Sequence, residues 1–341
     1  MVAPPPSWYN HRVNPNLLSA FPVVCPVCRK SDDDGLHLHT VEPEGPGHLL
    51  CVGCGFAFPL IDGIPLLAKD LGGLVRSNGL ALLDGAVSAS VAATLALAGD
   101  DDDAWQKMLE GLSTWGLSHW GDVAEPRAVF GFREFFDHLT RRAMHPVENA
   151  VELGCGFGRG LAALSLGAER VVGVDISVAA LKRARRLLAG EAQELPVRVA
   201  GRHYDVARLS PQDRCENVLL LAADALDPPL PPGIFERVVS LNLLDTIPRP
   251  RALLGVMDGL CAPGGELIVA SPFCWQTGIV DEGERIGDRD PADALMGLLE
   301  SGTGLSGPYT IEESFDLHWT LRRDARQDLG YSVHWIRARK V

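Results

Sequence analysis

The chain has 341 residues, of which 44 are acidic and 31 are basic, so its formal net charge is −13. This length allows two domains, or one large α/β domain with an appended module. The acidic balance, and a sequence without clustered Lys or Arg, disfavour a dedicated nucleic-acid partner but leave room for a local basic face.

Neither the N-terminus nor the apolar segments resemble targeting or membrane sequences. The first residues lack the charged and then apolar layout of a secretory signal. The longest apolar stretch, residues 79–99, is interrupted by Asp84 and by hydroxyl residues, and predicts a buried helix rather than a membrane span. We therefore expect a cytoplasmic protein without a membrane partner.

Two close cysteine pairs lie in the first expected domain, residues 1–70, behind a Pro-rich start that we expect to be extended. The pairs are separated by 22 residues and are Cys25-Pro-Val-Cys28 and Cys51-Val-Gly-Cys54. Four sulfur ligands on two tight turns make the closed tetrahedral site that zinc prefers. Because a closed site leaves no position for substrate, the predicted zinc is structural. The other four cysteines are scattered, which fits reduced thiols.

Residues 50–67 carry a family resemblance. They read LCVGCGFAFPLIDGIPLL, and this stretch is similar to the small zinc-ribbon proteins that bind and activate RNA and protein methyltransferases. The resemblance implies a zinc ribbon fused to its own catalytic domain. His37, His39 and His48 lie between the cysteine pairs; one of them as a replacement zinc ligand is the alternative to the surface positions that we expect.

Residues 71–145 form a second expected region. Apolar residues recur at three- and four-residue spacing over 104–112 and 130–139, which predicts a helical linker or lid. The acidic run 100–103 is expected to be a solvated loop that caps the first of these helices. The run Trp115-Gly-Leu-Ser-His119-Trp120-Gly-Asp122 places aromatic and polar side chains just before the next domain, as a possible lid over its ligand.

Strand-like and helix-like segments alternate over the third expected domain, residues 146–341. We expect strands at residues 150–153, 170–175, 218–222, 237–241 and 266–270, and a helix at 178–188. This alternation predicts a Rossmann-like, doubly wound α/β fold, in which helices cover both faces of a parallel sheet. Ligands bind such sheets at the carboxyl ends of the strands.

A Gly-rich turn follows the first of these strands and opens a helix, the context that a nucleoside-binding turn requires. Its sequence is Glu152-Leu-Gly154-Cys155-Gly156-Phe-Gly158. The spacing differs from the Gly-x-Gly-x-x-Gly of dinucleotide folds. Asp175 ends the next strand, 19 residues after Gly156, where an acid can accept both ribose hydroxyls. The predicted ligand is therefore adenosine without a required phosphate; a simple tight turn is the alternative.

This arrangement resembles the first two motifs of class I S-adenosylmethionine methyltransferases. Ala223-Asp224-Ala225 is similar to their adenine-contacting motif, and residues 261–269 to their turn into the fifth strand. For Asp224, loop capping is the alternative. The resemblance implies S-adenosylmethionine as cofactor, held by Glu152, Gly154, Cys155, Gly156, Gly158, Asp175, Ile176, Asp224, Ala225 and Asn242.

Methyl transfer is an in-line displacement, so the enzyme must hold the acceptor atom on the reaction axis and exclude water. An acceptor that starts protonated also needs a base or a low pKa. Asn242 and Asp245, after the fourth strand, are candidate contacts to cofactor and substrate, with helix capping as the alternative. Trp275, after the fifth strand, is a candidate wall of the acceptor pocket, with ordinary packing as the alternative. It opens a long segment to about residue 308, and loops of that length are usually functional or disordered.

Several segments together resemble the mercaptohistidine N-methyltransferases of ovothiol synthesis. They are Asn242-Leu-Leu-Asp245, Ser271-Pro-Phe-x-Trp275, Asp316-Leu-His-Trp319-x-Leu-Arg322-x-x-x-Arg326 and Gly201-Arg-His-Tyr204. The resemblance implies a small imidazole or amino-acid acceptor whose carboxylate binds Arg322 or Arg326; surface ion pairing is the alternative for both. The chain departs from this family at residues 284–287, where an aromatic or Trp-Leu-Gly-like element is usual.

Three functional hypotheses remain. We expect a methyltransferase with a small-molecule substrate, which the acidic charge and the C-terminal resemblance favour. The alternative is an RNA or protein methyltransferase that uses the zinc ribbon as a substrate or partner module. The third is a non-enzymatic binding module, against which the intact Gly-rich turn and Asp175 argue. The sequence gives no indication of the oligomeric state.

Overall fold

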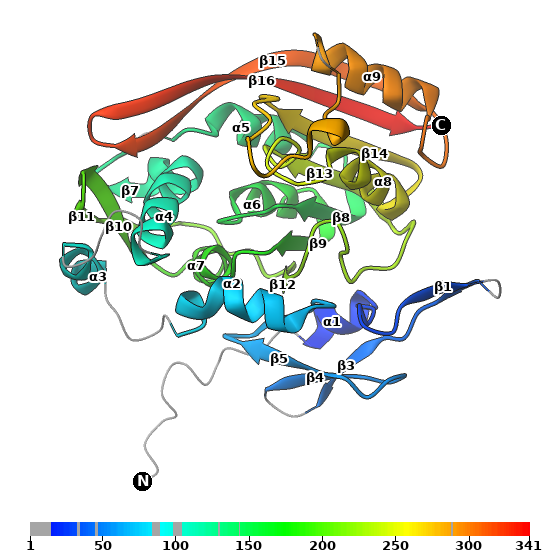
Figure 1. Cartoon of the computed structure of the whole chain (residues 1–341), viewed down its shortest axis with the longest axis horizontal. Coiled ribbons are helices and arrows are strands. Elements are labelled where there is room, and N and C mark those ends of the chain that lie inside the picture. Colours follow the sequence, from blue (N-terminus) through cyan, green and yellow to red (C-terminus); the bar gives the residue numbers. More distant parts are fainter. Residues whose placement is uncertain are drawn as a thin grey trace.

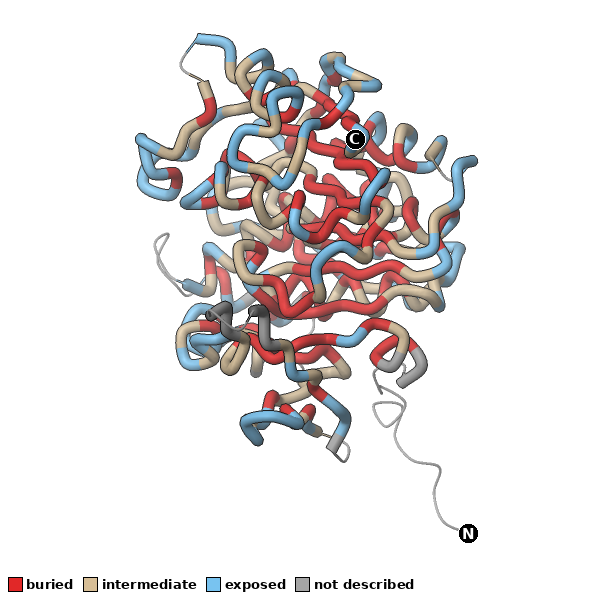
Figure 2. The backbone as a smooth tube through the Cα atoms, turned by 90° about the vertical axis from the view of Figure 1, so that its right-hand side faces the viewer, coloured by how far each residue is buried: buried red, intermediate tan, exposed pale blue. Residues whose placement is uncertain are grey.

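The structure is a computed structural model that describes residues 15–32, 35–44, 47–83, 89–97, 104–128, 130–142, 144–287 and 289–341. A seven-stranded sheet runs through the middle of the molecule (Figure 1). Figure 2 shows its buried strands stacked through the centre of the chain. Within the described residues, no helix is both long and apolar enough to cross a membrane.

The central sheet has the strand order β12-β9-β8-β13-β14-β16-β15. Its strands are β8 (Val147–Leu153), β9 (Ala168–Asp175), β12 (Val218–Ala222), β13 (Phe235–Leu241), β14 (Cys261–Ser271), β15 (Tyr309–Asp324) and β16 (Gln327–Lys340). The first five are parallel, and β16 is antiparallel to both of its neighbours. The predicted Rossmann-like α/β fold is confirmed, with the expected strands in place and most of them longer than predicted.

Apolar residues alternate between the two faces of this sheet, as strands buried on both sides require. One face packs against α4 (Ala104–Trp120), α5 (Arg133–Arg142), α6 (Arg159–Ser165) and α7 (Val178–Leu188). The other packs against α8 (Pro250–Leu260), α9 (Pro291–Ser301) and the N-terminal module. The helix predicted at 178–188 is confirmed.

The N-terminal module covers part of the second face, beside β12. It contains α1 (Pro15–Ala20), the hairpin of β1 (Lys30–Asp32) and β2 (Gly35–His37), and a sheet of β3 (Val41–Glu44), β4 (His48–Cys51), β5 (Ala57–Ile61) and β6 (Ile64–Pro65). The expectation of an extended start is wrong for α1, because Leu17 and Leu18 bury themselves in the core of this face. Residues 1–14 lie outside the described residues.

The module is joined to the central sheet at its β12 edge. Leu66 forms a parallel bridge with Ala222, and the Leu67 amide donates to the Ala222 carbonyl at 2.9 Å. Arg29 pairs with Asp227 and donates to the Pro228 carbonyl at 2.9 Å. Backbone pairing of this kind makes the module a continuation of the sheet edge rather than a separate body.

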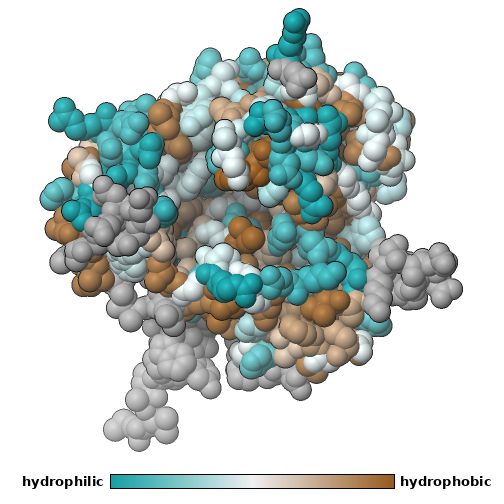
Figure 3. Space-filling view, viewed as in Figure 1, coloured by the Kyte–Doolittle hydropathy of each residue, from teal (hydrophilic) through white to brown (hydrophobic). Residues whose placement is uncertain are grey.

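The region between module and sheet is helical, as expected. It contains α2 (Leu71–Leu83), α3 (Ala89–Ala96) and α4, then a short 3₁₀ turn (Gly121–Val123), β7 (Ala124–Glu125) and α5. Hydrophobic side chains gather around α3 and on the N-terminal module, and elsewhere on this side they are mixed with hydrophilic ones (Figure 3). The acidic run 100–103 lies outside the described residues.

Two hairpins were not anticipated from the sequence. The strands β10 (Gln193–Ala200) and β11 (His203–Leu209) form a small sheet with β7, and β15 and β16 form a long C-terminal hairpin. The far end of the long hairpin extends past the central sheet toward α4 and β10 (Figure 1). The long loop expected up to residue 308 instead contains a 3₁₀ turn (Glu282–Glu284) and α9.

Candidate active site

A cavity of about 360 Å³ lies at the carboxyl ends of β8, β9 and β13, under α4. It is lined by Lys107, Met108, Gly111, Leu112, Trp115, His119, Phe132, Phe136, Glu152, Gly154, Gly156, Phe157, Asp175, Ser177, Ala179, Ala180, Leu241, Asn242 and Leu243. This is the position at which doubly wound sheets bind ligands, and the volume falls in the range of small-molecule sites.

The Gly-rich turn after β8 has a backbone that only glycine adopts without strain. Gly154, Gly156 and Gly158 have φ angles of +78°, +50° and +76°. A Cβ atom on Gly156 would lie 3.3 Å from His119 Nε2, and one on Gly154 would lie 3.0 Å from the Leu243 side chain. The glycines therefore meet both a conformational requirement and a steric one, which explains why the sequence signal was readable.

Asp175 ends β9 and ties the two turns of the site together. One carboxylate oxygen accepts from the Gly156 amide and the other from the Ser177 amide, both at 2.8 Å. Burial raises the pKa of Asp175, and these backbone donors oppose that shift. Each oxygen keeps a further lone pair with which it can accept a ligand hydroxyl.

Glu152 is a second, deeper carboxyl group in the cavity wall. The residue is 2% exposed, and within the described part of the chain its Oε2 atom has no hydrogen-bond partner. Burial, and then the charge of Asp175, raise the pKa of Glu152 well above its usual range. Two carboxyl groups beside a cavity suit a ligand that carries positive charge, as a sulfonium or an ammonium group does.

Asn242 lies where β13 leaves the sheet and lines the same cavity. Its φ angle is +54°, which is uncommon for a residue with a side chain. Both side-chain polar atoms, Oδ1 and Nδ2, are buried, and no described residue offers either of them a hydrogen bond. Buried polar atoms are nearly always paired, so these two atoms indicate a ligand contact.

Asp245 and Trp275 do not line the cavity. Asp245 is buried and accepts hydrogen bonds from Ser271 Oγ at 3.2 Å and from the Cys274 amide at 3.1 Å. It thus holds a loop in which Phe273 and Trp275 have φ angles of +51° and +35°. The catalytic roles of Asp245 and Trp275 stay predictions, and the geometry gives Asp245 a supporting position.

Five residues expected to contact the cofactor also lie outside the cavity lining. Cys155 is fully buried, Ala225 is buried, and the Ile176 side chain is 54% exposed. Gly158 opens α6 behind the turn. Asp224 accepts from the Leu226 amide at 2.8 Å, which is the loop-capping alternative. Their contacts to a cofactor stay predictions.

The opposite wall of the cavity is aromatic. Trp115 and His119 come from α4, Phe132 directly precedes α5, and Phe136 lies in its first turn. The His119 ring lies edge-on to Phe132, with 5.1 Å between centroids, and its Nδ1 atom is buried without a hydrogen-bond partner among the residues that the structure describes. Burial, and then the charge of Arg159, lower the pKa of His119 to about 3, so the imidazole is neutral at physiological pH.

Sequence reasoning noted the run that contains Trp115 and His119 as a lid, but did not name either as a site residue. Residues 115–120 of this run form the C-terminal end of α4, where the Trp120 indole donates to the Phe157 carbonyl at 2.8 Å. That bond pins the helix end against the Gly-rich turn. The lid is therefore a fixed wall of the cavity in this structure.

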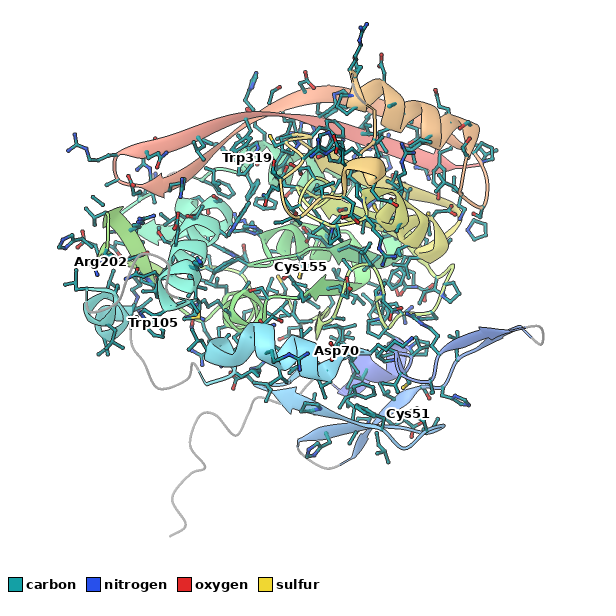
Figure 4. The ribbon with its side chains drawn as sticks, viewed as in Figure 1. Cys51, Asp70, Trp105, Cys155, Arg202 and Trp319 are labelled. Carbon is teal, nitrogen blue, oxygen red and sulfur yellow. The ribbon has the colours of Figure 1, made fainter. Side chains whose placement is uncertain are left out.

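The C-terminal hairpin supports this wall from behind. Trp319 stacks on Phe132 at 4.5 Å and on Tyr331 at 4.7 Å between ring centroids, and lies between the hairpin and α4 (Figure 4). Arg322 instead pairs with Asp328 inside the hairpin, at 2.8 and 3.0 Å. Arg326 lies in the hairpin turn, and Arg202 lies at the left edge of Figure 4. None of these arginines lines the cavity.

The four cysteines of the N-terminal module come together as predicted. Their sulfur atoms all lie within 4.8 Å of one another, with 3.8 Å between Cys25 and Cys54 and 3.5 Å between Cys28 and Cys51. A tetrahedral zinc site with Zn–S bonds of about 2.3 Å has sulfur atoms about 3.8 Å apart, so the donor set and its spacing fit zinc. His39 Nδ1 lies 3.4 Å from Cys28 Sγ, beside this cluster.

The match to a protein-family model agrees with the fold. Residues 151–269 match the family model described as "Methyltransferase domain". Among solved structures, the N-methyltransferase NodS from Bradyrhizobium japonicum WM9, in complex with S-adenosyl-L-homocysteine, is 18% identical, with a TM-score of 0.43 over 74% of this chain and 99% of that chain. Magnesium protoporphyrin IX methyltransferase (ChlM) from Synechocystis PCC 6803, with bound S-adenosylmethionine, is 15% identical, with a TM-score of 0.42 over 69% of this chain and 96% of that chain. None of the curated proteins compared with the chain matches it.

The fold, the Gly-rich turn and the domain match define a class I methyltransferase domain. The protein is an S-adenosylmethionine-dependent methyltransferase with a four-cysteine cluster near its N-terminus.

Proposed function

We propose that this enzyme transfers the methyl group of S-adenosylmethionine to a small-molecule acceptor, and that the acceptor atom is an imidazole nitrogen of a histidine derivative. The observation that carries the small-molecule part is the cavity of about 360 Å³ at the carboxyl ends of the strands, whose two walls are the Gly-rich turn with Asp175 and the aromatic side chains contributed by α4 and α5. The imidazole part rests on the sequence resemblance and on the aromatic side chains of the second wall.

The geometry suits an in-line transfer to a flat ring. A donor whose ribose hydroxyls bind Asp175 places its sulfonium group in the cavity, near Asn242 and Glu152. Trp115, Phe132 and Phe136 offer ring faces and edges against which a planar acceptor packs. Holding the acceptor between this wall and the methyl group, out of water, is the main contribution that an enzyme makes to such a displacement.

His119 supplies a polar contact within the aromatic wall. A neutral imidazole carries one donor and one acceptor nitrogen, and His119 Nδ1 has no hydrogen-bond partner among the described residues. Burial lowers the pKa of His119 to about 3, so the imidazole stays neutral and its Nδ1 atom can either donate to an acceptor ring or accept from one. A ring with an N–H group and a lone pair meets both requirements.

The alternative is an RNA or protein methyltransferase, and the resemblance of residues 50–67 favours it. Against it, no residue of the described N-terminal module lines the cavity, and the contacts of Arg29, Leu66 and Leu67 are made to the β12 edge of the sheet. A macromolecular substrate would have to reach a small, aromatic-walled cavity from outside.

The test is transfer of labelled methyl from S-adenosylmethionine to three sets of acceptors: histidine, mercaptohistidine and related amines; total RNA; and a protein mixture. The D175A variant serves as the control with an impaired donor site. We expect label on an imidazole nitrogen, located by mass spectrometry. Label on RNA or protein, with none on the small molecules, would contradict the proposal and favour the alternative.

A further inference from the structure

The turn that carries the donor-binding acid is held by a side chain from outside the methyltransferase domain. Asn78 lies on α2, in the region that follows the N-terminal module, and is buried. Its Nδ2 atom donates to the Ile176 carbonyl at 3.1 Å and to the Leu74 carbonyl at 3.0 Å. Its Oδ1 atom accepts from the Val178 amide at 2.9 Å.

These bonds fix the backbone immediately after Asp175. Val178 is the first residue of α7, and the first amides of a helix have no partner within the helix. Ser177 Oγ accepts from the Ala180 amide at 3.3 Å, and Asn78 satisfies the Val178 amide. The Asn78 side chain therefore holds this segment at both ends, because it donates to the Ile176 carbonyl and accepts from the Val178 amide.

The position of Asp175 depends on the same turn. Its carboxylate accepts from the Ser177 amide, so a shift of residues 176–178 moves the group that faces the cavity. Ser177 itself lines the cavity. An in-line reaction tolerates little misplacement of the donor, so a residue that anchors this turn also affects how the donor is held.

A second set of contacts ties the same region to the methyltransferase domain. Lys182 on α7 pairs with Asp62 of the N-terminal module at 3.2 Å and donates to the Ala81 carbonyl of α2 at 3.0 Å. With the Leu66–Ala222 bridge, these contacts seat α2 against the donor turn. Asn78 is thus presented by a surface that the module and α7 build together.

We propose that Asn78 is a positioning residue of the donor site, through which α2 holds the Asp175–Ser177 turn in the conformation that binds S-adenosylmethionine. The proposal rests on the assignment of Asp175 as the acid that binds the donor. It makes the N-terminal region part of the cofactor site, although the matched methyltransferase domain begins at residue 151.

The experiment measures two quantities in the full-length protein: the dissociation constant of S-adenosylmethionine by calorimetric titration, and the unfolding midpoint without ligand. The variants are N78A, N78D and D175A. The matched control is N217A, because Asn217 also bridges two backbone carbonyls, those of Ser165 and Ala168 at 3.1 and 2.8 Å, and does not line the cavity.

We expect N78A to bind S-adenosylmethionine roughly tenfold more weakly, as the loss of buried hydrogen bonds to the turn implies. N217A lowers the unfolding midpoint but keeps the affinity. N78D retains an acceptor for the Val178 amide and loses the donor to Ile176, so its affinity falls between N78A and the wild type. It also keeps a folded protein available if N78A does not fold, because a carboxylate at a helix N-terminus is favourable.

Wild-type affinity in a folded N78A, or in N78D if N78A is not folded, overturns the role of Asn78, whatever the change in stability. Equal loss of affinity in N78A and N217A does the same, because it points to general destabilisation. Wild-type affinity in D175A instead overturns the placement of the donor at that acid, and the reason for the role of Asn78 with it. The proposal is supported by loss of affinity in D175A and in N78A, or in N78D if N78A is not folded, together with retained affinity in N217A.

Discussion

The two walls of the cavity are built in different ways. The donor wall comes from consecutive residues at the ends of β8 and β9, where Gly154, Gly156 and Asp175 hold their places through backbone geometry. The aromatic wall comes from side chains on α4 and α5, and Trp319 of the C-terminal hairpin supports it from behind. One wall is set by local turns and the other by long-range packing.

This difference predicts different responses to substitution. A change in the donor wall acts on the backbone and removes binding of S-adenosylmethionine, whereas a change in the aromatic wall leaves the donor bound and affects the acceptor. The variants that follow test these responses, in order of decreasing expected effect.

The largest effect is expected for G156V. Valine is strained at a φ of +50°, and a side chain there would collide with His119, whose Nε2 lies 3.3 Å from the Cβ position. We expect the affinity for S-adenosylmethionine to fall by at least about 100-fold, because both the turn and the cavity lining are disturbed. The control is G264V: Gly264 has a φ of +71° but open space around it. An equal loss of donor binding in G264V would contradict a specific role of the Gly-rich turn in binding the donor.

Loss of the proposed structural zinc is expected to have the next largest effect. Removing zinc with a chelator, or the variant C51S, opens the four-cysteine cluster and destabilises the module, because structural zinc contributes folding energy. Since the module is joined to Ala222 and seats α2, affinity for S-adenosylmethionine should fall with zinc content, measured by metal analysis and calorimetry on the same samples. C274S, which alters an exposed thiol outside the cluster, is the control. Full donor affinity in zinc-free protein would separate the module from the donor wall.

The variant H119F tests the aromatic wall. It keeps ring packing against Phe132 and removes the unpaired nitrogen. We expect kcat/KM for the acceptor to fall roughly 10- to 100-fold, mainly through KM, while the dissociation constant of S-adenosylmethionine stays within about twofold. H138F is the matched control, since His138 also packs on aromatic rings but lies outside the cavity. A loss of donor affinity in H119F would place this histidine on the donor wall instead.

The smallest effect is expected for E152Q, and it depends on pH. The folded state raises the pKa of Glu152, so it holds a proton that the unfolded state releases. The stability of the ligand-free wild type should therefore fall as pH rises from the ordinary carboxyl pKa toward the raised value, by up to about 1.4 kcal/mol per pH unit.

E152Q should flatten this part of the profile and raise the unfolding midpoint near neutral pH. It should also weaken donor binding a few-fold, because a positive ligand favours the ionised form of Glu152 and pairs with it, and an amide cannot ionise. Chemical denaturation across pH, with and without S-adenosylmethionine, measures both. If the stability of E152Q and of the wild type depended on pH in the same way, burial would not raise the pKa of Glu152.

The sequence predicted the features that depend on local chemistry. Apolar strands, a Gly-rich turn that requires positive φ angles and two cysteine turns each leave a pattern over a few residues, and the structure contains all three. The helix at 178–188 followed from the same kind of pattern.

The remaining features depend on contacts between distant segments. The C-terminal hairpin left a readable signal, because Leu317, Trp319 and Leu321 alternate with more exposed residues along β15. The family resemblance of this stretch predicted no strand there. His119 and Asn78 left none, since their roles come from the positions of α4 and α2 against the sheet. Asp245 has the chemistry of a site residue, yet its neighbours Ser271 and Cys274 turn it toward a loop.

The most direct test of the two-walled cavity is a crystal structure of the protein with S-adenosyl-L-homocysteine bound. We expect the ribose to bind Asp175, the sulfur atom to lie near Asn242, and open space to remain between that sulfur atom and the rings of His119 and Phe132. A ligand bound elsewhere, or one whose sulfur atom faces away from the aromatic wall, would contradict it.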